Sequence, residues 1–446
     1  MDIPVYLGRG RTLESRRYGE KTHRFFTLKT DEANHMLFLG GSGYGKTTVL
    51  RAIAEAIWLS CNLRGVKPLI IIFERKFDVS KAEKIRQIYY YESQKYSEKK
   101  LYKKYGEETW KYVEKYVKLM EKDPLTYGCP GDFAMGMPNV LGKYTKFNGE
   151  NSILGYFGLE PRAFPVNRFV FRPTRSLESI QIDNGWMTNV IDAKIKYDLI
   201  DYSFIKHISS LGDSTLYGER IRNLWDVEMI RDPDKVLERA RELEVSDPPS
   251  RTYLRIEEAM MRLKKDPLFT REGSFFRHIT NKRINVIDFS LNSDLTAVEE
   301  NLIFKLIVNF GIMIAYKYKI PVFFFVDEIQ HFARSPIGLS AIDRIYREGR
   351  SMGIGLIGAT QYLAGIRRTI LDGCTHLGIV GKIGSPEDLA KLKRIIPGID
   401  EFDIGIADAY TLEDYLKMKK RNKFRGYFAY DKELVERIIY RHPQSL

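Results

Sequence analysis

Residues 40–47 read Gly-Gly-Ser-Gly-Tyr-Gly-Lys-Thr, and they are the most informative stretch of the chain. They fit the phosphate-binding pattern G-x-x-x-x-G-K-[ST] at every fixed position. An apolar run at 35–39 predicts a buried strand before them, and the pattern of residues 47–58 predicts a helix after them. A glycine-rich turn followed by a surface lysine is the alternative interpretation, and the strand–loop–helix setting argues against it.

This loop has the residue types that binding a nucleoside triphosphate requires. Glycines let several backbone N–H groups point into one concave anion site, and the following helix adds the positive end of its dipole. Lys46 would contact the β- and γ-phosphates, and the hydroxyl of Thr47 would bind Mg²⁺. We therefore expect ATP and Mg²⁺ as cofactors, bound by Gly40, Gly41, Ser42, Gly43, Tyr44, Gly45, Lys46, Thr47 and Thr48.

A second segment, at 321–328, is an apolar strand that ends in two carboxylates. Asp327 is expected to contribute to the Mg²⁺ shell with Thr47, and Glu328 to orient and activate the attacking water. A strand that ends in Asp-Glu is common by itself, and a capped strand end is the alternative. The phosphate loop at 40–47 favours the catalytic interpretation.

A third segment, at 346–361, carries polar residues at both ends of an apolar run. The run at 354–359 predicts a strand that ends at Gln361, where a side chain can sense the γ-phosphate. Arg347 and Arg350 come just before that strand. An arginine that completes a neighbouring subunit's site stabilises transition-state charge, which would make an oligomer the active unit. The alternatives are a satisfied polar residue at a strand end and ion-paired surface arginines.

Composition sets broad limits on the class of protein. The chain has 446 residues, of which 44% are hydrophobic and 29% charged, as in ordinary globular proteins. Its net charge of +13 favours a polyanionic partner, although charge alone is a weak indication. The three cysteines form no metal or disulfide spacing, so we expect core packing and a reducing, cytoplasmic setting. No signal peptide or membrane span is predicted, so any membrane association would be peripheral.

The apolar runs along the chain predict an α/β fold with a mainly parallel sheet. They lie at 35–39, 69–73, 168–172, 284–288, 322–326, 354–359, 376–380 and 426–430. Several of them are continuous rather than alternating, which is typical of strands buried on both faces of a parallel sheet. We expect an N-terminal segment at 1–30, an ATPase core at 31–80, 165–176 and 280–446, and a mostly helical insertion at 81–164 and 177–279.

The first part of the insertion is basic and rich in tyrosine. Residues 81–122 contain 12 Lys and Arg against 7 Glu and no Asp, together with eight Tyr. Trp110, Val113, Val117 and Met120 recur at helical spacing, which predicts an amphipathic helix. A solvated basic face is the preferred interpretation, and a surface that contacts nucleic acid is the alternative. The basic run at 417–425 leaves the same two interpretations open.

Together, residues 40–47, 326–328 and 347–361 resemble the HerA–FtsK superfamily in sequence and order. The third segment, Arg-Glu-Gly-Arg-x-x-Gly-Ile-Gly-Leu-Ile-x-Ala-Thr-Gln, is far more specific than either nucleotide motif. Residues 287–290 also resemble a strand of HerA-like proteins, and 74–78 a segment that usually opens with Asp. Here Glu74 occupies that position.

The resemblance implies a hexameric, RecA-like ATPase core whose relatives pump DNA or power conjugation and secretion machines. It matches Arg350 to the trans-acting arginine, with Arg347 as second candidate, and implies double- or single-stranded DNA as substrate. The implied settings are conjugation, DNA import, genome packaging and DNA end resection with a nuclease. A VirB4-type secretion ATPase acting on protein at a membrane channel remains an alternative. So does a nucleotide-gated assembly factor with negligible turnover.

Overall fold

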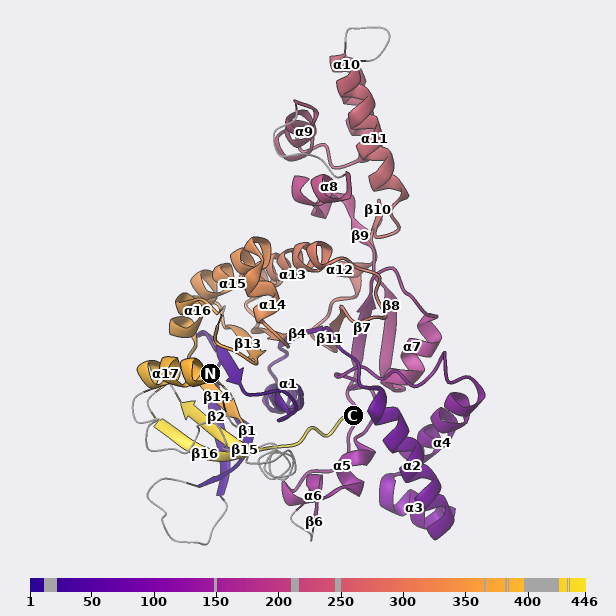
Figure 1. Ribbon diagram of the computed structural model, residues 1–446, viewed down its shortest axis with the longest axis vertical. Coiled ribbons are helices and arrows are strands. Elements are labelled where there is room, and N and C mark those ends of the chain that lie inside the picture. Colours follow the sequence, from indigo (N-terminus) through magenta and orange to yellow (C-terminus); the bar gives the residue numbers. More distant parts are fainter. Residues whose placement is uncertain are drawn as a thin grey trace.

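The computed structural model describes residues 1–11, 22–147, 151–209, 216–244, 250–364, 366–381, 383, 385–396, 425–430, 432 and 434–446. Within them, parallel strands form the centre of one large sheet (Figure 1). In spatial order these strands are β14 (His376–Val380), β3 (Met36–Leu39), β13 (Ile354–Thr360), β12 (Val322–Val326), β4 (Leu69–Glu74), β11 (Ile284–Asp288), β7 (Val166–Val170) and β8 (Thr188–Asp192).

The sheet continues beyond β14 with antiparallel strands. They are β15 (Arg425–Tyr430), β16 (Leu434–Tyr440), β1 (Asp2–Arg11) and β2 (Thr22–Lys29), in that order. The predicted α/β class and every predicted strand are confirmed, with ends displaced by at most two residues. The sequence-based list lacked β1, β2, β8 and β16. The domain limits remain a prediction, although β1 and β2 join the central sheet and β8 forms its far edge.

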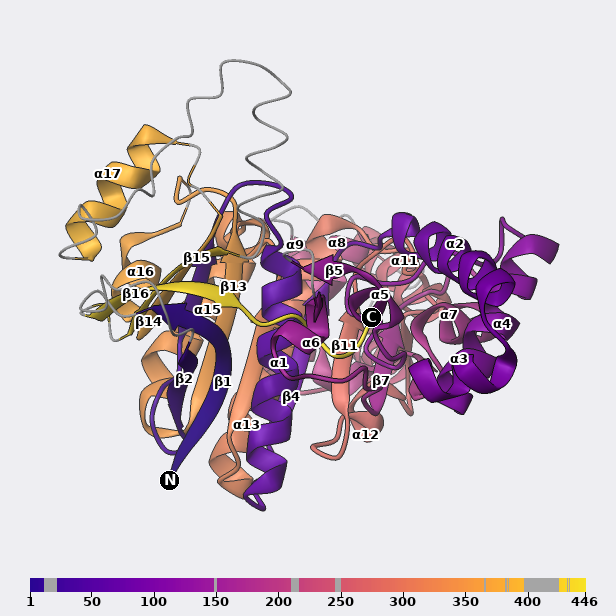
Figure 2. The same ribbon diagram turned by 90° about the horizontal axis from the view of Figure 1, so that it is seen from below.

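The two faces of the sheet are covered by different helices, because alternate residues of each strand point to opposite sides. On one face, α1 (Lys46–Leu63) packs Val49, Ile53 and Ile57 against a cluster that includes Phe38 and Ile72. On the other face, α13 (Ala297–Tyr318) and α15 (Pro336–Glu348) pack on alternate residues of the same strands. Figure 2 shows α1 running across its face of the sheet.

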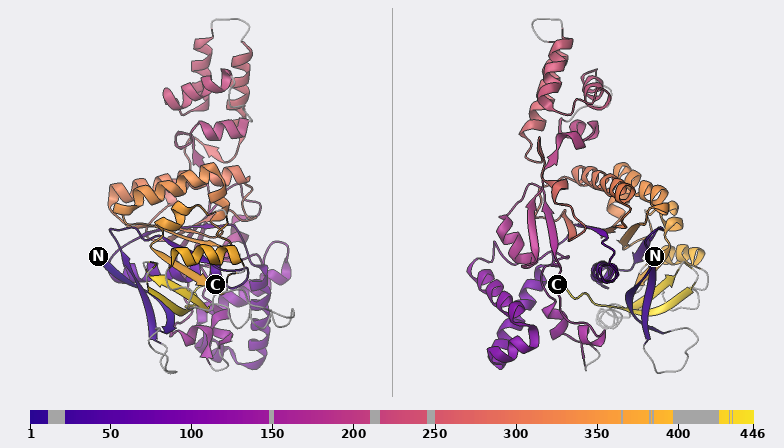
Figure 3. Two further views of the ribbon diagram at one scale, coloured as in Figure 1. Left: turned by 60° about the vertical axis from the view of Figure 1, so that its left-hand side comes forward. Right: turned by 180° about the vertical axis from the view of Figure 1, so that it is seen from behind.

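Most of the helices between β4 and β11 belong to two separate groups (Figures 1 and 3). One group lies beside the sheet and contains α2 (Val79–Lys95), α3 (Glu98–Tyr105), α4 (Glu107–Lys122), α5 (Val140–Tyr144) and α6 (Ile153–Tyr156). The other projects away as an arm of α8 (Tyr202–Ser209), α9 (Leu216–Arg222), a π-helical turn (Asn223–Val227), α10 (Pro233–Leu243) and α11 (Arg251–Lys265). The arm joins the sheet through β9 (Ile195–Lys196) and β10 (Phe269–Thr270).

The amphipathic helix predicted within the first group is α4. Its residues Trp110, Val113, Val117 and Met120 are buried in one cluster with residues of α2 and α3. Several lysines of this group pair with glutamates on its surface, among them Lys111 with Glu107 and Lys118 with Glu114. These pairs neutralise part of the basic face.

The remaining elements are short. They are α7 (Leu177–Asn184), α12 (Phe275–His278), α14 (Gln330–Arg334), α16 (Arg368–Gly373), α17 (Pro386–Ile395), the 3-10 turns Tyr197–Leu199 and Gly349–Ser351, and the hairpin of β5 (Lys146–Phe147) with β6 (Asn151–Ser152). Among the helices described, none combines the length and apolarity that crossing a bilayer requires. Cys61 and Cys374 are buried, and Cys129 is partly buried.

Candidate nucleotide-binding site

The phosphate loop connects β3, which lies between β14 and β13 in the sheet, to α1. Gly45 is the N-cap of α1 with φ 101°, in the left-handed region that favours glycine, and no side chain caps the helix. Gly40 lies so close to β14 that an added Cβ would be 2.1 Å from the carbonyl oxygen of Val380. Glycine is therefore required at both ends of the loop, and the first-turn N–H groups of α1 have no side-chain acceptor.

Lys46 lies buried at the start of α1, with 6% of its surface exposed. Its Nζ donates to the carbonyl oxygen of Gly41 at 3.1 Å, so the side chain folds back over the loop. Burial lowers the pKa of Lys46, and the carboxylates of Glu328 and Asp327 act in the opposite direction. The lysine thus lies among the residues of the second segment, as the sequence predicts.

Thr47 and Asp327 meet at the carboxyl ends of β3 and β12. The Thr47 hydroxyl donates to Asp327 Oδ2 at 2.8 Å. Burial raises the pKa of Asp327 to about 6, although the Thr47 hydrogen bond opposes the shift. The described residues contain no cluster of three His, Cys, Asp or Glu side chains that could bind a metal by themselves. A hydroxyl beside one carboxylate is a donor set that suits Mg²⁺, which keeps waters and takes substrate phosphates as its other ligands.

Glu328 follows Asp327, and three side chains donate hydrogen bonds to its carboxylate. Lys76 Nζ donates to Glu328 Oε1 at 2.9 Å, Gln361 Nε2 donates to the same oxygen at 2.5 Å, and Gln330 donates to Oε2. The backbone of Glu328 has φ 55°, which is uncommon for a residue with a side chain. Such strained backbone is concentrated at functional sites. Gln361 therefore contacts the predicted catalytic carboxylate, and its role as a γ-phosphate sensor stays a prediction.

The pKa of Glu328 is below its ordinary value. Burial acts to raise it, but the hydrogen bonds from Lys76, Gln361 and Gln330 together outweigh that effect. Lys76 and Gln330 were missed in the sequence analysis. Lys76 lies in the segment 74–78, and Gln330 lies two residues after Glu328. Nothing in the sequence shows which of the side chains in these segments contact the carboxylate of Glu328.

Removing the Lys76 cation is expected to raise the pKa of Glu328. If Glu328 must be ionised to accept a proton, Lys76→Met should move the acidic limb of the kcat–pH profile to higher pH. The measurement is steady-state ATP hydrolysis between pH 4.5 and 9, with Lys118→Met as control. Lys118 is an exposed lysine of α4 that pairs with Glu114 instead. An unchanged acidic limb in Lys76→Met would contradict this role.

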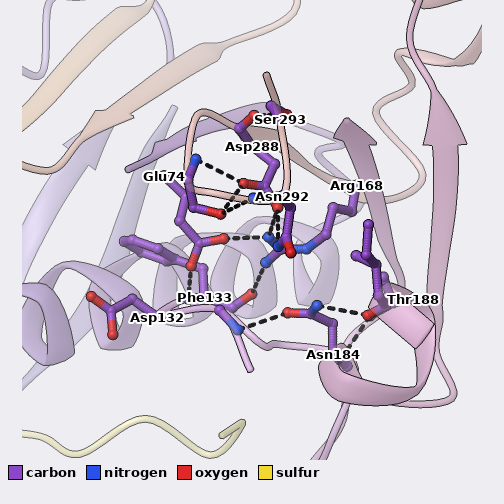
Figure 4. Close-up of polar contacts among 12 residues, drawn as sticks. Glu74, Asp132, Phe133, Arg168, Asn184, Thr188, Asp288, Asn292 and Ser293 are labelled. Atoms are coloured by element: carbon purple, nitrogen blue, oxygen red, sulfur yellow. Dashed lines mark hydrogen bonds and ion pairs between the residues drawn. The ribbon is translucent and has the colours of Figure 1, made fainter. Parts of the chain in front are cut away.

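Glu74, which occupies the position where the resembling segment usually opens with Asp, belongs to a cluster of buried polar contacts (Figure 4). Its carboxylate pairs with Arg168 at 2.5 Å, and Arg168 also pairs with Asp288 at 2.6 Å. All three side chains are at most 1% exposed. Glu74 also accepts a hydrogen bond from the backbone N–H of Phe133 at 2.5 Å. This buried cluster connects β4, β7 and β11, so Glu74 has a structural role.

The two predicted arginines lie at the other end of β13 from Gln361. The strand spans seven residues, so at ~3.3 Å per residue they are about 20 Å from the carboxyl edge. Arg347 is exposed at the end of α15, where its Nε donates to the carbonyl oxygen of Asp343 at 3.4 Å. The Arg350 side chain and the basic run at 417–424 lie outside the described residues. Arg347 does not contact the phosphate loop of its own chain.

No protein-family model and no curated protein matches the chain. Solved structures that are similar include VirB4 of Thermoanaerobacter pseudethanolicus, with TM-score 0.45 and 11% identity over 91% of this chain and 88% of that one. The plasmid coupling protein TrwB in complex with ADP and Mg²⁺ gives TM-score 0.41 and 9% identity over 100% and 97%.

Two ATPase domains of EssC from Geobacillus thermodenitrificans give TM-score 0.36 and 9% identity over 100% of this chain and 45% of that one. At these identities and scores the likeness is distant and concerns the fold.

Proposed function

We propose that the chain is an ATP-hydrolysing motor subunit that moves DNA. One observation carries the ATPase part: segments far apart in the sequence converge on one edge of the sheet. Thr47 contacts Asp327 at 2.8 Å, and Gln361 contacts Glu328 at 2.5 Å. Phosphoryl transfer to water requires a phosphate loop, a pair of metal ligands and a carboxylate whose position is fixed by hydrogen bonds.

Each residue has a role that follows from its position. The loop N–H groups and Lys46 bind the phosphates and offset their negative charge. Thr47 and Asp327 are the protein ligands for Mg²⁺, which neutralises phosphate charge when bound. Glu328 accepts the proton of the attacking water, while Lys76 and Gln361 fix the direction of its carboxylate. Hydrogen-bond partners on both oxygens limit rotation of that side chain.

The proposed active unit is a ring in which an arginine of one subunit completes the site of the next. Support comes from the resemblance of residues 347–361 to the HerA–FtsK superfamily and from the exposed position of Arg347. We expect at least one of the variants Arg347→Ala and Arg350→Ala to lose ATPase activity when it is assayed alone. That variant should regain part of the activity when mixed with Glu328→Gln subunits, because some interfaces of a mixed ring combine an intact arginine with an intact carboxylate. Activity of the mixtures that equals the sum of the separate proteins would contradict trans action.

DNA is the proposed substrate because of the net charge of +13 and the superfamily resemblance. We expect duplex DNA to raise the ATP hydrolysis rate severalfold at low salt and the stimulation to fade as salt rises. The measurement is the ATPase rate with and without duplex and single-stranded DNA over a salt series. A rate that no DNA alters at any salt concentration would contradict a DNA motor and favour the protein-secretion ATPase. Conjugation, import and packaging all move DNA, so each of them predicts this stimulation.

A further inference from the structure

A cavity of about 650 Å³ lies between the phosphate-loop helix and the first helical group. Thr48 and Arg51 of α1 line one side, α2 and α5 line the others, and His442 contributes from the C-terminal peptide. This volume is within the range of small-molecule sites, which is about 300 to 1,000 Å³. None of the residues that contact Glu328 lines it, but Thr48, which is expected to bind ATP, does, so the cavity adjoins the nucleotide site without including the hydrolytic carboxylate.

One buried and one partly buried cation, Arg51 and Lys81, face this cavity. Arg51 is 4% exposed; its Nη1 donates to the carbonyl oxygen of Asp132 at 2.7 Å, but its buried Nε has no hydrogen-bond partner. Lys81 Nζ contacts the carbonyl oxygens of Gly131 and Asp132 at 3.1 and 3.3 Å. An anion bound beside Arg51 and Lys81 would interact with both positive charges.

The charge around these cations is not balanced by the cavity's own side chains. Lys84 adds a third cation to the lining, and Asp78 is the lining carboxylate. Asp78 accepts hydrogen bonds from the backbone N–H and hydroxyl of Ser80, and the Asp132 carboxylate lies 3.8 Å from Lys81. Burial, and next to it the nearby Arg51 charge, lowers the pKa of Lys81 to about 8. Positive charge is therefore in excess among the lining side chains, and the carboxylates of Glu55, Glu74 and Asp132 behind them offset part of it.

The other end of the cavity is apolar and aromatic. Ile88, Tyr91, Leu141, Tyr144 and Ile153 line it. The rings of Tyr91 and Tyr144 lie edge to face, with centroids 6.2 Å apart, and the two residues are 50% and 37% exposed. Partly exposed tyrosine rings are surfaces on which a planar base can stack. The cavity thus combines an anion-binding end with an end that suits a nucleobase.

We propose that this cavity binds a mononucleotide, with its phosphate against Arg51, Lys81 and Lys84 and its base against Tyr91 and Tyr144. The inference does not rest on the motor function, because none of these residues belongs to the hydrolytic centre. Thr48 and Arg51 are on the helix that begins at the phosphate loop. Occupancy of the cavity therefore offers a way to change ATP binding through α1.

The test is isothermal titration of AMP into the full chain and into single variants. Lys84→Gln and Tyr91→Ala should each weaken AMP binding about fivefold to tenfold, because one charge-assisted contact or one stacking surface is lost. Both side chains are on α2 and at least partly exposed, and circular dichroism checks that the variants are folded. Arg86→Gln, on the same helix but outside the cavity, where Arg86 pairs with Glu83, is the matched control and should leave the AMP affinity unchanged.

Further titrations separate the possible ligands. Inorganic phosphate and adenosine should each bind more weakly than AMP. If inorganic phosphate bound as tightly as AMP, the proposed contact with the base would be wrong. If a 5′-phosphorylated oligonucleotide bound and AMP did not, the proposal that the ligand is a mononucleotide would be wrong. AMP affinity that falls in Lys46→Ala but not in Lys84→Gln would place AMP in the phosphate loop and overturn the proposal. ATP hydrolysis on the same samples tests the motor function independently.

Discussion

Replacing Glu328 by glutamine should lower the turnover number for ATP by about 100-fold or more and leave ATP binding intact. General-base catalysis contributes about 10² to 10⁴ to a rate, and an amide cannot accept the proton of the attacking water. The substitution preserves side-chain size and leaves Lys46 and Thr47 unchanged. Because Gln361 donates to this side chain at 2.5 Å, the amide can still accept that bond through its oxygen.

The measurement is single-turnover and steady-state hydrolysis, together with equilibrium binding of a fluorescent ATP analogue. Glu258→Gln is a matched control, because Glu258 is on α11 in the projecting arm, where it pairs with Arg255 at 2.8 Å. That variant should hydrolyse ATP at the wild-type rate. If Glu328→Gln also hydrolysed ATP at the wild-type rate, Glu328 would not be the base. If the wild type were equally slow, the nucleotide-gated assembly factor would be favoured.

The centre of this site was predictable because local patterns and one topological rule suffice. The loop at 40–47, the Asp327–Glu328 pair and Gln361 each follow an apolar run. In a parallel sheet, residues that follow the strands gather at one edge. β12 and β13 are neighbours in register, with Val326 opposite Gly358, so their following residues meet. No knowledge of distant packing is needed for that step.

The contacts of Lys76 and Arg168 were not predictable in the same way. Lys76 is one of many lysines, and its pairing with Glu328 depends on how the chain turns after β4. Arg168 is within the apolar strand Val-Asn-Arg-Phe-Val, where an arginine is a signal of a buried partner. Its partners come from β4 and β11, and strand order cannot be obtained from a single sequence. For the same reason the sequence does not predict β1, β2 and β16, whose positions depend on pairing with distant segments.

Arg168→Met should be strongly destabilising. Arg168 is fully buried and contacts Glu74, Asp288 and the carbonyl oxygen of Phe133. Methionine fills a similar volume but leaves two buried carboxylates without a cation. Breaking a buried ion pair by removing one partner costs about 3 to 5 kcal/mol. Chemical unfolding should show that loss, and Arg344→Met, which breaks a half-exposed pair with Glu348, should cost far less.

The loss should depend on pH in a definite direction. Burial is the main cause that raises the pKa of Glu74 to about 7, while Arg168 acts to lower it. A carboxyl group with a raised pKa binds more protons in the folded than in the unfolded state. Its contribution to stability is therefore present below its ordinary pKa and lost as the pH rises through about 7. Without Arg168 the pKa of Glu74 rises further, so the variant should lose more stability relative to wild type at pH 8 than at pH 5.

A second substitution separates charge from packing. Glu74→Gln added to Arg168→Met removes one of the two unpaired carboxylates, so the double variant should regain part of the lost stability at pH 8. It should regain little at pH 5, where the single variant can protonate Glu74 instead. Equal losses at both pH values, with no recovery in the double variant, would mean that Arg168 stabilises β4, β7 and β11 through shape alone. The charge argument for the cluster in Figure 4 would then be wrong.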